Sequence, residues 1–244
     1  MPLCCLCEQP VARWLPHPQA AQRSEFMILM DTVGSDLAIF HCPHCGCTDR
    51  DRHLWLYMLA AGLPEQLAGA SVLHLAPEAP LEPKIEACRP ARYERGDLHP
   101  TRAHHRRLDA EQLPFEDAAF DLIIANHLLE HVRHPERALG EFARCLAPGG
   151  VLIAQTPYAP ALKHTFELDR SPSPDFAQVY YGQVDHVRLF GGDISARFHA
   201  AGLQGTLLPH DSVLPGMDPL EFGCNRHEPF FAFSKPAEAM AEAA

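Results

Sequence analysis

The sequence contains no long hydrophobic run and no extended basic stretch. No apolar segment approaches the roughly 20 residues of a bilayer-spanning helix, and residues 1–7 lack the basic and apolar regions of a secretion signal. With 20 Lys and Arg against 31 Asp and Glu, the formal net charge is −11, which disfavours attraction to nucleic-acid backbones or anionic lipid. We therefore expect a soluble, cytoplasmic protein that has no membrane partner and does not act on nucleic acid.

The length and composition indicate a globular protein with one main domain. The chain has 244 residues, of which 47% are apolar and 21% charged, a balance that allows a core to be buried without a binding partner. At roughly 150 residues per domain, the length corresponds to one large domain, or to one domain with a small appendage. Repeat arrays and long disordered chains are disfavoured. The sequence leaves open whether the protein forms a homo-oligomer.

Cysteine is abundant near the N-terminus. Six of the nine cysteines fall within the first 47 residues, and such clustering in a cytoplasmic chain favours metal binding over disulfides. Cys4 and Cys7 form one C-x-x-C pair, and Cys42 and Cys45 form a second. The two-residue gap lets both sulfur atoms of a pair face one ion, and four thiolates are a preferred ligand set of Zn²⁺. We therefore predict a structural zinc site at these four cysteines, with no open coordination position.

Three alternatives to this zinc site stay open. Cys5 or Cys47 can replace a neighbouring ligand, an iron–sulfur cluster can form although its usual spacings are absent, or the cysteines can be reduced thiols in a small core. The module resembles a zinc ribbon, and the 34 residues between the two pairs accommodate a hairpin that carries 26–30 and 37–40. Because this segment has few apolar residues for its length, metal binding is expected to supply much of its folding free energy.

A helix is predicted directly after the cysteine module. The apolar run 54–62 ends at Gly62, a common helix stop, and this helix is expected to join the module to the main domain. The charged run 49–53 is expected to be a solvated first turn, and the alternative is that it binds an anionic group. The predicted organisation is a zinc-ribbon-like module over 1–49, a linking helix over 50–69, a main domain over 70–235 and a disordered tail over 236–244.

From residue 70 onward, short β-rich runs alternate with helical segments. The run 120–125 is almost continuously apolar, as expected of a strand buried on both faces of a parallel sheet. Repeated βα units imply a doubly wound α/β sheet whose ligands lie beyond the carboxyl ends of its strands. Strands are predicted at 71–75, at 91–95 with its end at 96–97, before 108–109, at 120–125 and at 151–155; helices at 82–88, 135–146 and 194–201; and a closing antiparallel pair at 205–209 and 228–233.

Four motifs in order carry a specific resemblance. They are Asp109-Ala110-Glu111-Gln112-Leu113-Pro114-Phe115, Phe120-Asp121, Asn126-His127-Leu128-Leu129-Glu130-His131-Val132 and Leu146-Ala147-Pro148-Gly149-Gly150. With this order and these gaps, residues 70–210 resemble a class I S-adenosylmethionine-dependent methyltransferase of the small-molecule type, including a subgroup in which a cysteine ribbon precedes the catalytic domain. The resemblance implies a Rossmann-like, mostly parallel sheet of seven strands, with S-adenosylmethionine as the cofactor.

The resemblance also implies where the cofactor binds. Asp97 ends the second strand, next to Leu98, where the family's acidic residue accepts hydrogen bonds from the ribose hydroxyls; the alternative role for Asp97 is to cap a turn. Asp109 and the backbone amide of Ala110 match the positions that bind the adenine amino group. On the same basis, the residues assigned to the methionine half are Asn126 and His127.

The first loop departs from the family pattern. It reads His74-Leu75-Ala76-Pro77-Glu78-Ala79-Pro80 and contains no G-x-G. Ala76 is small enough for a close approach of the backbone to the cofactor, and Pro77 can make the turn rigid. Glu78 is the candidate partner of the cofactor's ammonium group.

Residues 158–190 interrupt the βα alternation. In similar enzymes an insertion at this place covers the acceptor pocket, so a lid is predicted here. Tyr181, Asp185, His186 and Arg188 lie within eight residues of one another, and a turn can bring the last three together. We predict a substrate role for this cluster; the alternative is an internal salt-bridge network that holds the lid in place.

A general base is needed only for some acceptors. For a hydroxyl or a protonated amine, a histidine near its unperturbed pKa is the usual choice, and His131, after Glu130, is one candidate. A helix-capping or core role is the alternative for His131. The basic cluster 104–107 is expected to be a solvated face at the wrong edge of the sheet.

The leading functional hypothesis is methyl transfer to a small molecule, such as a sugar, a natural-product intermediate or another metabolite. For this in-line displacement the protein mainly has to align donor and acceptor and exclude water. Two alternatives are a noncatalytic, methyltransferase-like binding or assembly protein and a methyltransferase that docks a macromolecule through the zinc module. A nicotinamide-dependent oxidoreductase is disfavoured because G-x-G-x-x-G is absent.

Overall fold

A single sheet of seven strands organises the molecule. The computed structural model describes residues 1–20 and 24–237, and its main sheet has the strand order β3-β2-β1-β4-β5-β9-β8. The neighbours from β3 to β5 are parallel, whereas β9 is antiparallel to both β5 and β8. The predicted seven-stranded, mostly parallel sheet and its closing antiparallel pair are confirmed. The strands are β1 (Ser71–Leu75), β2 (Arg92–Asp97), β3 (Arg106–Arg107), β4 (Phe120–Ile124), β5 (Leu146–Ile153), β8 (Gln204–Leu208) and β9 (Phe230–Ser234).

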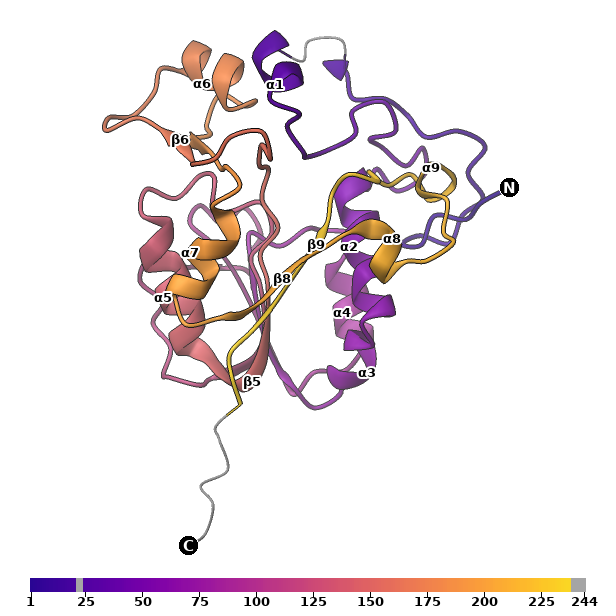
Figure 1. Ribbon diagram of the computed structural model, residues 1–244. Helices are drawn as coiled ribbons and strands as arrows, with labels where there is room; N and C mark the ends of the chain where they lie inside the picture. Colours follow the sequence, from indigo (N-terminus) through magenta and orange to yellow (C-terminus); the bar gives the residue numbers. More distant parts are fainter. Residues whose placement is uncertain (21–23, 238–244) are drawn as a thin grey trace, which may run out of the picture.

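Helices cover both faces of this sheet (Figure 1). Leu73 and Ile123 pack in one core cluster with residues of α5 and α7, whereas Val72 and Leu122 pack in the other with residues of α2 and α4. Because successive side chains of a strand point to opposite faces, this alternation buries both sides of β1 and β4. The predicted doubly wound architecture is therefore confirmed. The helices are α2 (Asp49–Ala60), α3 (Leu63–Gln66) and α4 (Glu82–Ala87) on one face, and α5 (Pro135–Cys145) and α7 (Ile194–Ala200) on the other.

The third strand has two residues and ends just before the predicted 108–109. Its two residues pair with Gly96 and Asp97, the last two residues of β2. This register places the preceding segment, 98–105, near the carboxyl edge of the sheet. The predicted edge is therefore wrong for His104 and His105, which contact the carboxylate of Glu82, whereas residues 104, 106 and 107 are exposed, as predicted.

The hairpin predicted for 26–30 and 37–40 is absent from the described residues. Instead, 25–29 form helix α1 (Glu25–Leu29), whose N-cap Ser24 accepts a hydrogen bond from Met27 N. Phe26, Met27 and Met30 pack with aromatic residues of the insertion, residues 158–190. These apolar side chains thus follow a helical period and find partners outside the cysteine module.

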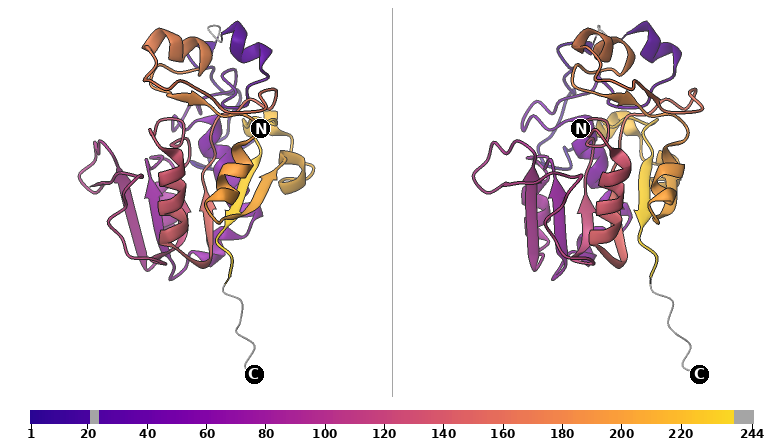
Figure 2. Two further views of the ribbon diagram at one scale, coloured as in Figure 1. Left: turned by 60° about the vertical axis from the view of Figure 1, so that its left-hand side comes forward. Right: turned by 90° about the vertical axis from the view of Figure 1, so that its left-hand side faces the viewer.

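The insertion lies beyond the carboxyl edge of the sheet, beside α1 (Figure 2). Ser24 Oγ donates to Val179 O at 2.6 Å, which connects the two segments. None of the helices in the described part of the chain is long and apolar enough to cross a bilayer. The insertion contains β6 (Phe166–Glu167), α6 (Pro174–Tyr180) and β7 (Arg188–Leu189), and the loop before β9 contains α8 (His210–Val213) and α9 (Pro219–Phe222).

The first turn of α2 is buried, not solvated as predicted. Asp49, Arg52 and His53 are fully buried, because this turn lies between the cysteine module and the loop that precedes β9. The guanidinium of Arg52 donates to carbonyls of both regions and stacks 4.0 Å over the ring of Trp14. The helix thus joins the module to the sheet, through polar contacts as well as its apolar side chains. Residues 238–244 of the predicted tail lie outside the described residues.

Candidate active site

The loop after β1 contains three of the residues predicted to bind the cofactor. Ala76 has φ +47°, a left-handed conformation that normally favours glycine. Pro77 follows it, and Glu78 Oε2 lies 2.6 Å from His74 Nε2. Burial raises the pKa of Glu78, but contact with His74 outweighs burial and the net effect is a lowered pKa. The loop therefore adopts a glycine-like turn without glycine and holds an anionic carboxylate at the carboxyl edge.

Asp97 and Asp109 lie at the carboxyl ends of β2 and β3. Oδ1 of Asp97 accepts a hydrogen bond from His99 N at 2.7 Å, and Oδ1 of Asp109 accepts one from Glu111 N at 2.9 Å. Each side chain caps its own turn, and Oδ2 of each carries no hydrogen bond within the described residues. Capping and binding a polar ligand are compatible here. The neighbours named for the same site are the exposed Leu98 and the buried Ala110.

Asn126 and His127 follow β4, a central strand, and so lie at the carboxyl edge of the sheet. Asn126 Oδ1 accepts a hydrogen bond from Gln155 N at 3.0 Å, which ties the loop after β4 to the end of β5. His127 has φ +47° and lies between two carboxylates, with Nδ1 3.5 Å from Glu130 Oε1 and Nε2 3.4 Å from Glu228 Oε1. Both contacts are longer than good hydrogen bonds.

Sequence reasoning missed the buried group around Glu228, the Glu228 cluster. Its members are His53, His127, Glu130 and Glu228, joined by a contact of 3.5 Å between His53 Nδ1 and Glu228 Oε2. Five of its buried nitrogen and oxygen atoms have no hydrogen-bond partner. Glu228 is more than 70 residues from any motif of the resemblance, so no local pattern pointed to it.

The charges of this cluster alternate. Burial raises the pKa of Glu228, but His127 and His53 outweigh it and hold the pKa at about 2. Burial also raises the pKa of Glu130, but His127 outweighs it and holds this pKa at about 2. Burial and Arg50 lower the pKa of His127, yet Glu130 and Glu228 raise it overall. A cationic imidazole between two carboxylates is therefore built into the edge of the sheet.

Three of the acceptor-side candidates converge with His131. His131 Nδ1 lies 3.3 Å from Asp185 Oδ2, and its ring meets that of His186 edge to face at 4.8 Å. His186 Nδ1 donates to Tyr181 O at 2.8 Å. Burial lowers the pKa of His186 and keeps its imidazole neutral. Tyr181 is fully buried, and its hydroxyl has no hydrogen-bond partner.

Arg188 does not join this group. Its Nε lies 2.8 Å from Glu167 Oε2, and its other nitrogens donate to the carbonyl oxygens of Leu129, Val132 and Arg133. The turn that was expected to converge it with Asp185 and His186 instead leads into β7. Arg188 thus matches the alternative of an internal network that holds the insertion against the loop after β4.

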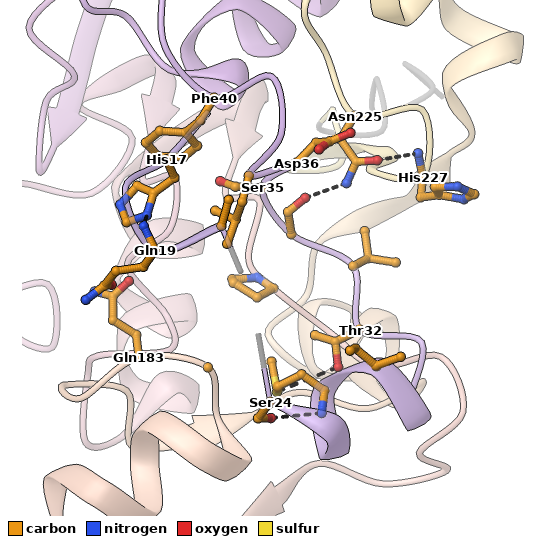
Figure 3. Close-up of a pocket in the computed structure, with 18 of the residues that line it drawn as sticks. His17, Gln19, Ser24, Thr32, Ser35, Asp36, Phe40, Gln183, Asn225 and His227 are labelled. Atoms are coloured by element: carbon orange, nitrogen blue, oxygen red, sulfur yellow. Dashed lines mark hydrogen bonds between the residues drawn. The ribbon is translucent and has the colours of Figure 1, made fainter. Parts of the chain in front are cut away.

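A cavity of about 740 Å³ lies beside this group. Its wall includes His186 and Tyr181 from the insertion, Pro157 after β5, and residues 31–38 of the N-terminal segment. Figure 3 shows His17 and Phe40 opposite Asn225 and His227 around it. None of the residues predicted to hold the cofactor lines the cavity.

Arg50 also lines the cavity and was not singled out from the sequence. It has no hydrogen bond or ion pair within the described residues, and its Nε is buried without a partner. Two residues further along α2, Arg52 donates to four different carbonyls. The alternative that the run 49–53 binds an anionic group therefore has a structural candidate in Arg50.

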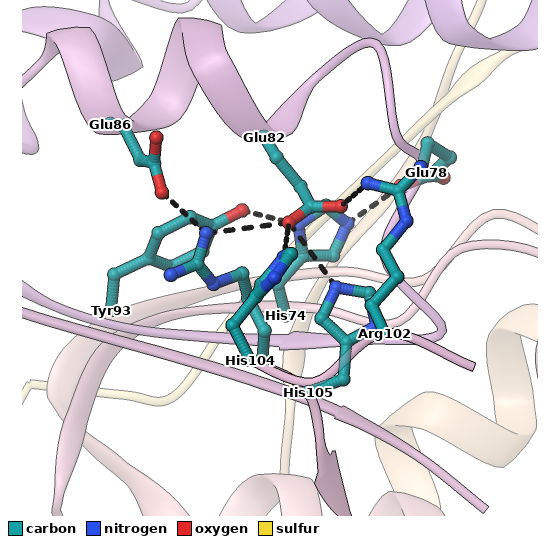
Figure 4. A network of polar contacts seen from close by, with 9 residues as sticks. His74, Glu78, Glu82, Glu86, Tyr93, Arg102, His104 and His105 are labelled. Carbon is teal, nitrogen blue, oxygen red and sulfur yellow. Dashed lines mark hydrogen bonds and ion pairs between the residues drawn. The ribbon is translucent and has the colours of Figure 1, made fainter. Parts of the chain in front are cut away.

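A second polar cluster, the Glu82 cluster, lies between α4 and the segment 98–105 (Figure 4). Glu82 is buried, and Arg102 donates to its Oε1 at 2.8 Å. Its Oε2 lies 2.9 Å from His104 Nε2, 3.2 Å from His105 Nε2 and 3.3 Å from Arg95. Burial raises the pKa of Glu82, but these neighbours lower it overall. Both oxygens of Glu82 are fully engaged.

The cysteine cluster has the dimensions of a metal site. One sulfur atom from each of Cys4, Cys7, Cys42 and Cys45 lies within 4.8 Å of the others. The separations are 4.0 Å for Cys4 and Cys45 and 3.8 Å for Cys7 and Cys42, whereas thiolates at 2.3 Å from a tetrahedral Zn²⁺ lie about 3.8 Å apart. Cys47 Sγ is 3.5 Å from Cys4 Sγ, so it borders the site.

Comparisons with known proteins agree with this geometry. A family model described as a methyltransferase domain matches residues 81–154. Demethylmenaquinone methyltransferase of Thermus thermophilus is 37% identical over 93 residues, which cover 38% of this chain and 37% of that protein. The mitochondrial 2-methoxy-6-polyprenyl-1,4-benzoquinol methylase of Caenorhabditis elegans is 39% identical over 56 residues, or 23% of this chain and 20% of that protein. The chain thus spans about a fifth to two fifths of these relatives.

A solved structure extends the likeness to nearly the whole chain. The crystal structure of the (4+2) cyclase SpnF superposes with a TM-score of 0.53 and 15% identity, covering 92% of this chain and 99% of that one. At this identity the likeness concerns the fold. It extends well beyond residues 81–154, which the family model covers.

Proposed function

We propose that the protein carries a class I S-adenosylmethionine-dependent methyltransferase domain and transfers a methyl group to a small-molecule acceptor. The observation that carries the proposal is the position of the cavity, which is lined by Pro157 after β5 and by residues of the insertion but by none of the predicted cofactor residues. Such an arrangement gives donor and acceptor separate sites that meet at the edge of the sheet. Two relatives named for quinone-type substrates support a small-molecule acceptor.

The residues at the edge suit a sulfonium cofactor. S-adenosylmethionine supplies an electrophilic methyl group, so the protein needs mainly to bind, orient and exclude water. Asp97 and Asp109 each keep one carboxylate oxygen without a hydrogen bond in the described structure, as ribose hydroxyls and an adenine amino group require. Glu78, held anionic by His74, suits the ammonium group. The left-handed turn at Ala76 brings the backbone close where the family uses glycine.

On the acceptor side, we propose that His186, His131, Asp185 and Tyr181 contact the substrate. His186 and Tyr181 line the cavity, and His131 and Asp185 adjoin His186. Arg188 holds the insertion in place and so acts as a positioning residue. Asp185→Asn is therefore expected to lower turnover while leaving cofactor affinity nearly intact.

Calorimetric titration with S-adenosylhomocysteine tests the cofactor site. Wild-type protein is expected to bind, and Asp97→Ala to weaken binding by about tenfold or more, because hydrogen bonds to a charged group contribute about 1.5–3 kcal/mol. Asp169→Ala, an exposed carboxylate of the insertion, serves as the matched control. Absence of binding by folded wild-type protein would contradict the proposal and favour a noncatalytic relative of the methyltransferases.

We further propose that Cys4, Cys7, Cys42 and Cys45 hold a structural Zn²⁺. The separations of their sulfur atoms suit a tetrahedral site, and four protein ligands leave no position for a substrate. Cys42→Ser is expected to release one zinc per chain and to lower the unfolding temperature, whereas Cys88→Ser, outside the cluster, keeps the metal. One zinc per chain retained after both Cys4 and Cys45 are replaced would contradict this assignment.

A further inference from the structure

Three side chains with metal-binding atoms meet beside the cavity, and one of them, His186, lines it. One oxygen of Glu130 and one ring nitrogen each of His131 and His186 lie within 4.8 Å of one another. Glu130 and His131 follow β4, whereas His186 comes from the insertion and lines the cavity. The fold therefore brings two imidazoles and a carboxylate, a donor set typical of transition-metal sites, to the boundary between the sheet and the acceptor space.

The two imidazoles have outer partners of the kind that metal-binding histidines use. His186 Nδ1 donates to the carbonyl oxygen of Tyr181 at 2.8 Å, so its lone pair resides on Nε2. His131 Nδ1 forms an ion pair with a carboxylate oxygen of Asp185 at 3.3 Å. Histidines that ligate a metal almost always donate their other ring N–H to a carbonyl or carboxylate, which fixes ring orientation and tautomer. His186 is thus held in advance in the form that binds a metal, and His131 has a carboxylate placed to do the same.

Glu130 has an oxygen that accepts no hydrogen bond from the part of the chain that the structure describes. Its Oε2 accepts a hydrogen bond from Thr156 Oγ1 at 2.8 Å, while its buried Oε1 accepts none from the described residues. His127 Nδ1, at 3.5 Å from Oε1, forms an ion pair with it but is too far for a good hydrogen bond. A buried carboxylate oxygen without a hydrogen bond is unfavourable, and a cation on the side of His131 and His186 would give Oε1 a direct partner.

We propose that Glu130, His131 and His186 bind a divalent transition-metal ion whose open coordination positions face the cavity and take an oxygen atom of the methyl acceptor. Three protein ligands leave positions for substrate, in contrast to the four-cysteine site. The metal would orient the acceptor oxygen and polarise it. That the bound oxygen belongs to the methyl acceptor rests on the proposed function. The metal site itself does not.

The other group of similar composition does not suit a cation. Glu82, His104 and His105 also lie within 4.8 Å of one another. However, the guanidinium groups of Arg95 and Arg102 already bind Glu82, and both imidazole Nε2 atoms are directed at its Oε2. Two fixed positive charges at the carboxylate would repel an ion. This group therefore provides an internal control.

Cobalt titration of the full chain, with zinc retained in the cysteine cluster, tests the proposal. Co²⁺ is the probe because its visible absorption distinguishes nitrogen and oxygen ligands from thiolates. Wild-type protein is expected to take up one Co²⁺ per chain without a thiolate-to-cobalt band. Glu130→Gln and His186→Gln are each expected to weaken binding by tenfold or more, and Asp185→Asn by about tenfold through His131.

Two variants serve as matched controls. His134→Gln changes an exposed histidine three residues after His131, and His104→Gln changes the Glu82 cluster; both are expected to leave Co²⁺ affinity unchanged. Circular dichroism and thermal unfolding show whether each variant folds. If Glu130→Gln does not fold, His186→Gln still tests the site.

Several results would overturn the metal site. They are no uptake of Co²⁺, uptake with a thiolate band, and uptake that only His104→Gln abolishes. The metal site and the proposed function fail separately: a protein that binds S-adenosylhomocysteine but no Co²⁺ refutes only the metal site. A protein that binds Co²⁺ but no S-adenosylhomocysteine keeps the metal site and contradicts methyl transfer.

Discussion

The Glu82 cluster and the Glu228 cluster lie at the same edge of the sheet but differ in how fully their polar atoms are paired. Both oxygens of Glu82 accept from neighbouring arginines and histidines. In the Glu228 cluster, by contrast, Glu130 Oε1, Glu228 Oε2 and both ring nitrogens of His127 have no hydrogen-bond partner. Buried polar atoms are normally satisfied, and exceptions often mark places that bind a ligand. The comparison indicates that the first cluster stabilises the fold and the second serves the site.

Two arginines in the first turn of α2 repeat this difference. Arg52 is fully buried and donates to the carbonyl oxygens of Ile39, Cys47 and Gly223. Arg50 is half-buried beside the cavity and has no hydrogen bond or ion pair with the part of the chain that the structure describes. One helix turn thus carries one arginine that connects the module to the sheet and one that is available to a ligand.

The largest effect is expected from breaking the fully paired cluster. Glu82→Gln keeps the size of the side chain but removes the negative charge that two arginines and two histidines contact. Breaking a buried ion pair by removing one partner costs about 3–5 kcal/mol, and because Arg102 is partly exposed, we expect a loss near the lower limit, about 3 kcal/mol. Urea unfolding of the zinc-loaded protein measures this loss.

Glu94→Gln is the matched control for that variant. Glu94 also pairs with two arginines, Arg92 and Arg106, but at the more exposed edge of the sheet. Exposed pairs contribute about 0–1 kcal/mol, so this variant should lose less than about 1 kcal/mol. Equal losses for Glu82→Gln and Glu94→Gln would remove the distinction that the comparison draws.

An intermediate effect is expected at Arg50. Arg50 lines the cavity, but its charge also acts on His127, next to the predicted methionine half of the cofactor, and we expect its guanidinium to bind the cofactor's carboxylate where the two sites adjoin. Arg50→Gln should then weaken the binding of S-adenosylhomocysteine by about tenfold or more, which corresponds to roughly 1.5–3 kcal/mol of binding free energy. It should leave methylthioadenosine, which lacks the carboxylate, unaffected. Calorimetry with both ligands makes the measurement.

Arg226→Gln is the control for Arg50, because Arg226 lies on an exposed loop near the cavity and pairs only with Asp211 among the described residues. It should change neither affinity. Equal weakening of both ligands by Arg50→Gln would indicate a structural role. If neither affinity changes, Arg50 faces the acceptor instead of the cofactor, and this prediction is wrong.

The sheet was predictable from the sequence because its signals are local. A continuous apolar run such as 120–125 and the helix stop at 147–150 report directly on burial and chain reversal. Helix α1 was mistaken for a strand because the partners of Phe26 and Met27 lie about 150 residues later, in the insertion. The spacing of the apolar residues alone did not show whether this segment would form a helix or a strand, because that depends on those distant partners.

The candidate site was only partly predictable. Asp97 and Asp109 follow strands, so their places at the carboxyl edge follow from the topology. Glu228 and Arg50 reach the site from the two ends of the main domain, and no motif links them to each other. The burial of the charged run 49–53 could not be foreseen either, because it depends on the loop before β9, which satisfies Arg52.

The smallest effect concerns Asp49, a neighbour of the Glu228 cluster. Burial, together with the negative charge of Glu228, raises the pKa of Asp49 to about 7. Its Oδ2 accepts a hydrogen bond from Asp36 N at 2.6 Å, but its Oδ1 is buried without a partner. Asp49 is thus a further incompletely paired group on the side of the molecule that faces the cavity.

The raised pKa fixes the sign of a pH effect. In the unfolded chain Asp49 titrates near 3.8, so between that value and about 7 the folded chain holds a proton that the unfolded chain has lost. Stability from this group is therefore present at low pH and decreases as pH rises towards 7. Between pH 6 and pH 8 the free energy of unfolding of the wild-type protein should therefore fall by about 1 kcal/mol because of Asp49.

Asp49→Asn removes the titration but keeps an oxygen that can accept from Asp36 N. The free energy of unfolding of the variant relative to wild type should therefore rise by about 1 kcal/mol from pH 6 to pH 8. Urea unfolding at both pH values measures the difference, which cancels the titration of groups common to both proteins. Asp121→Asn provides the control, because Asp121 is exposed and accepts a hydrogen bond from Ser71 N. If the difference in the free energy of unfolding between Asp49→Asn and wild type is the same at pH 6 and pH 8, Asp49 is already ionised in the folded protein. Asp49 would then resemble the fully paired carboxylates such as Glu82.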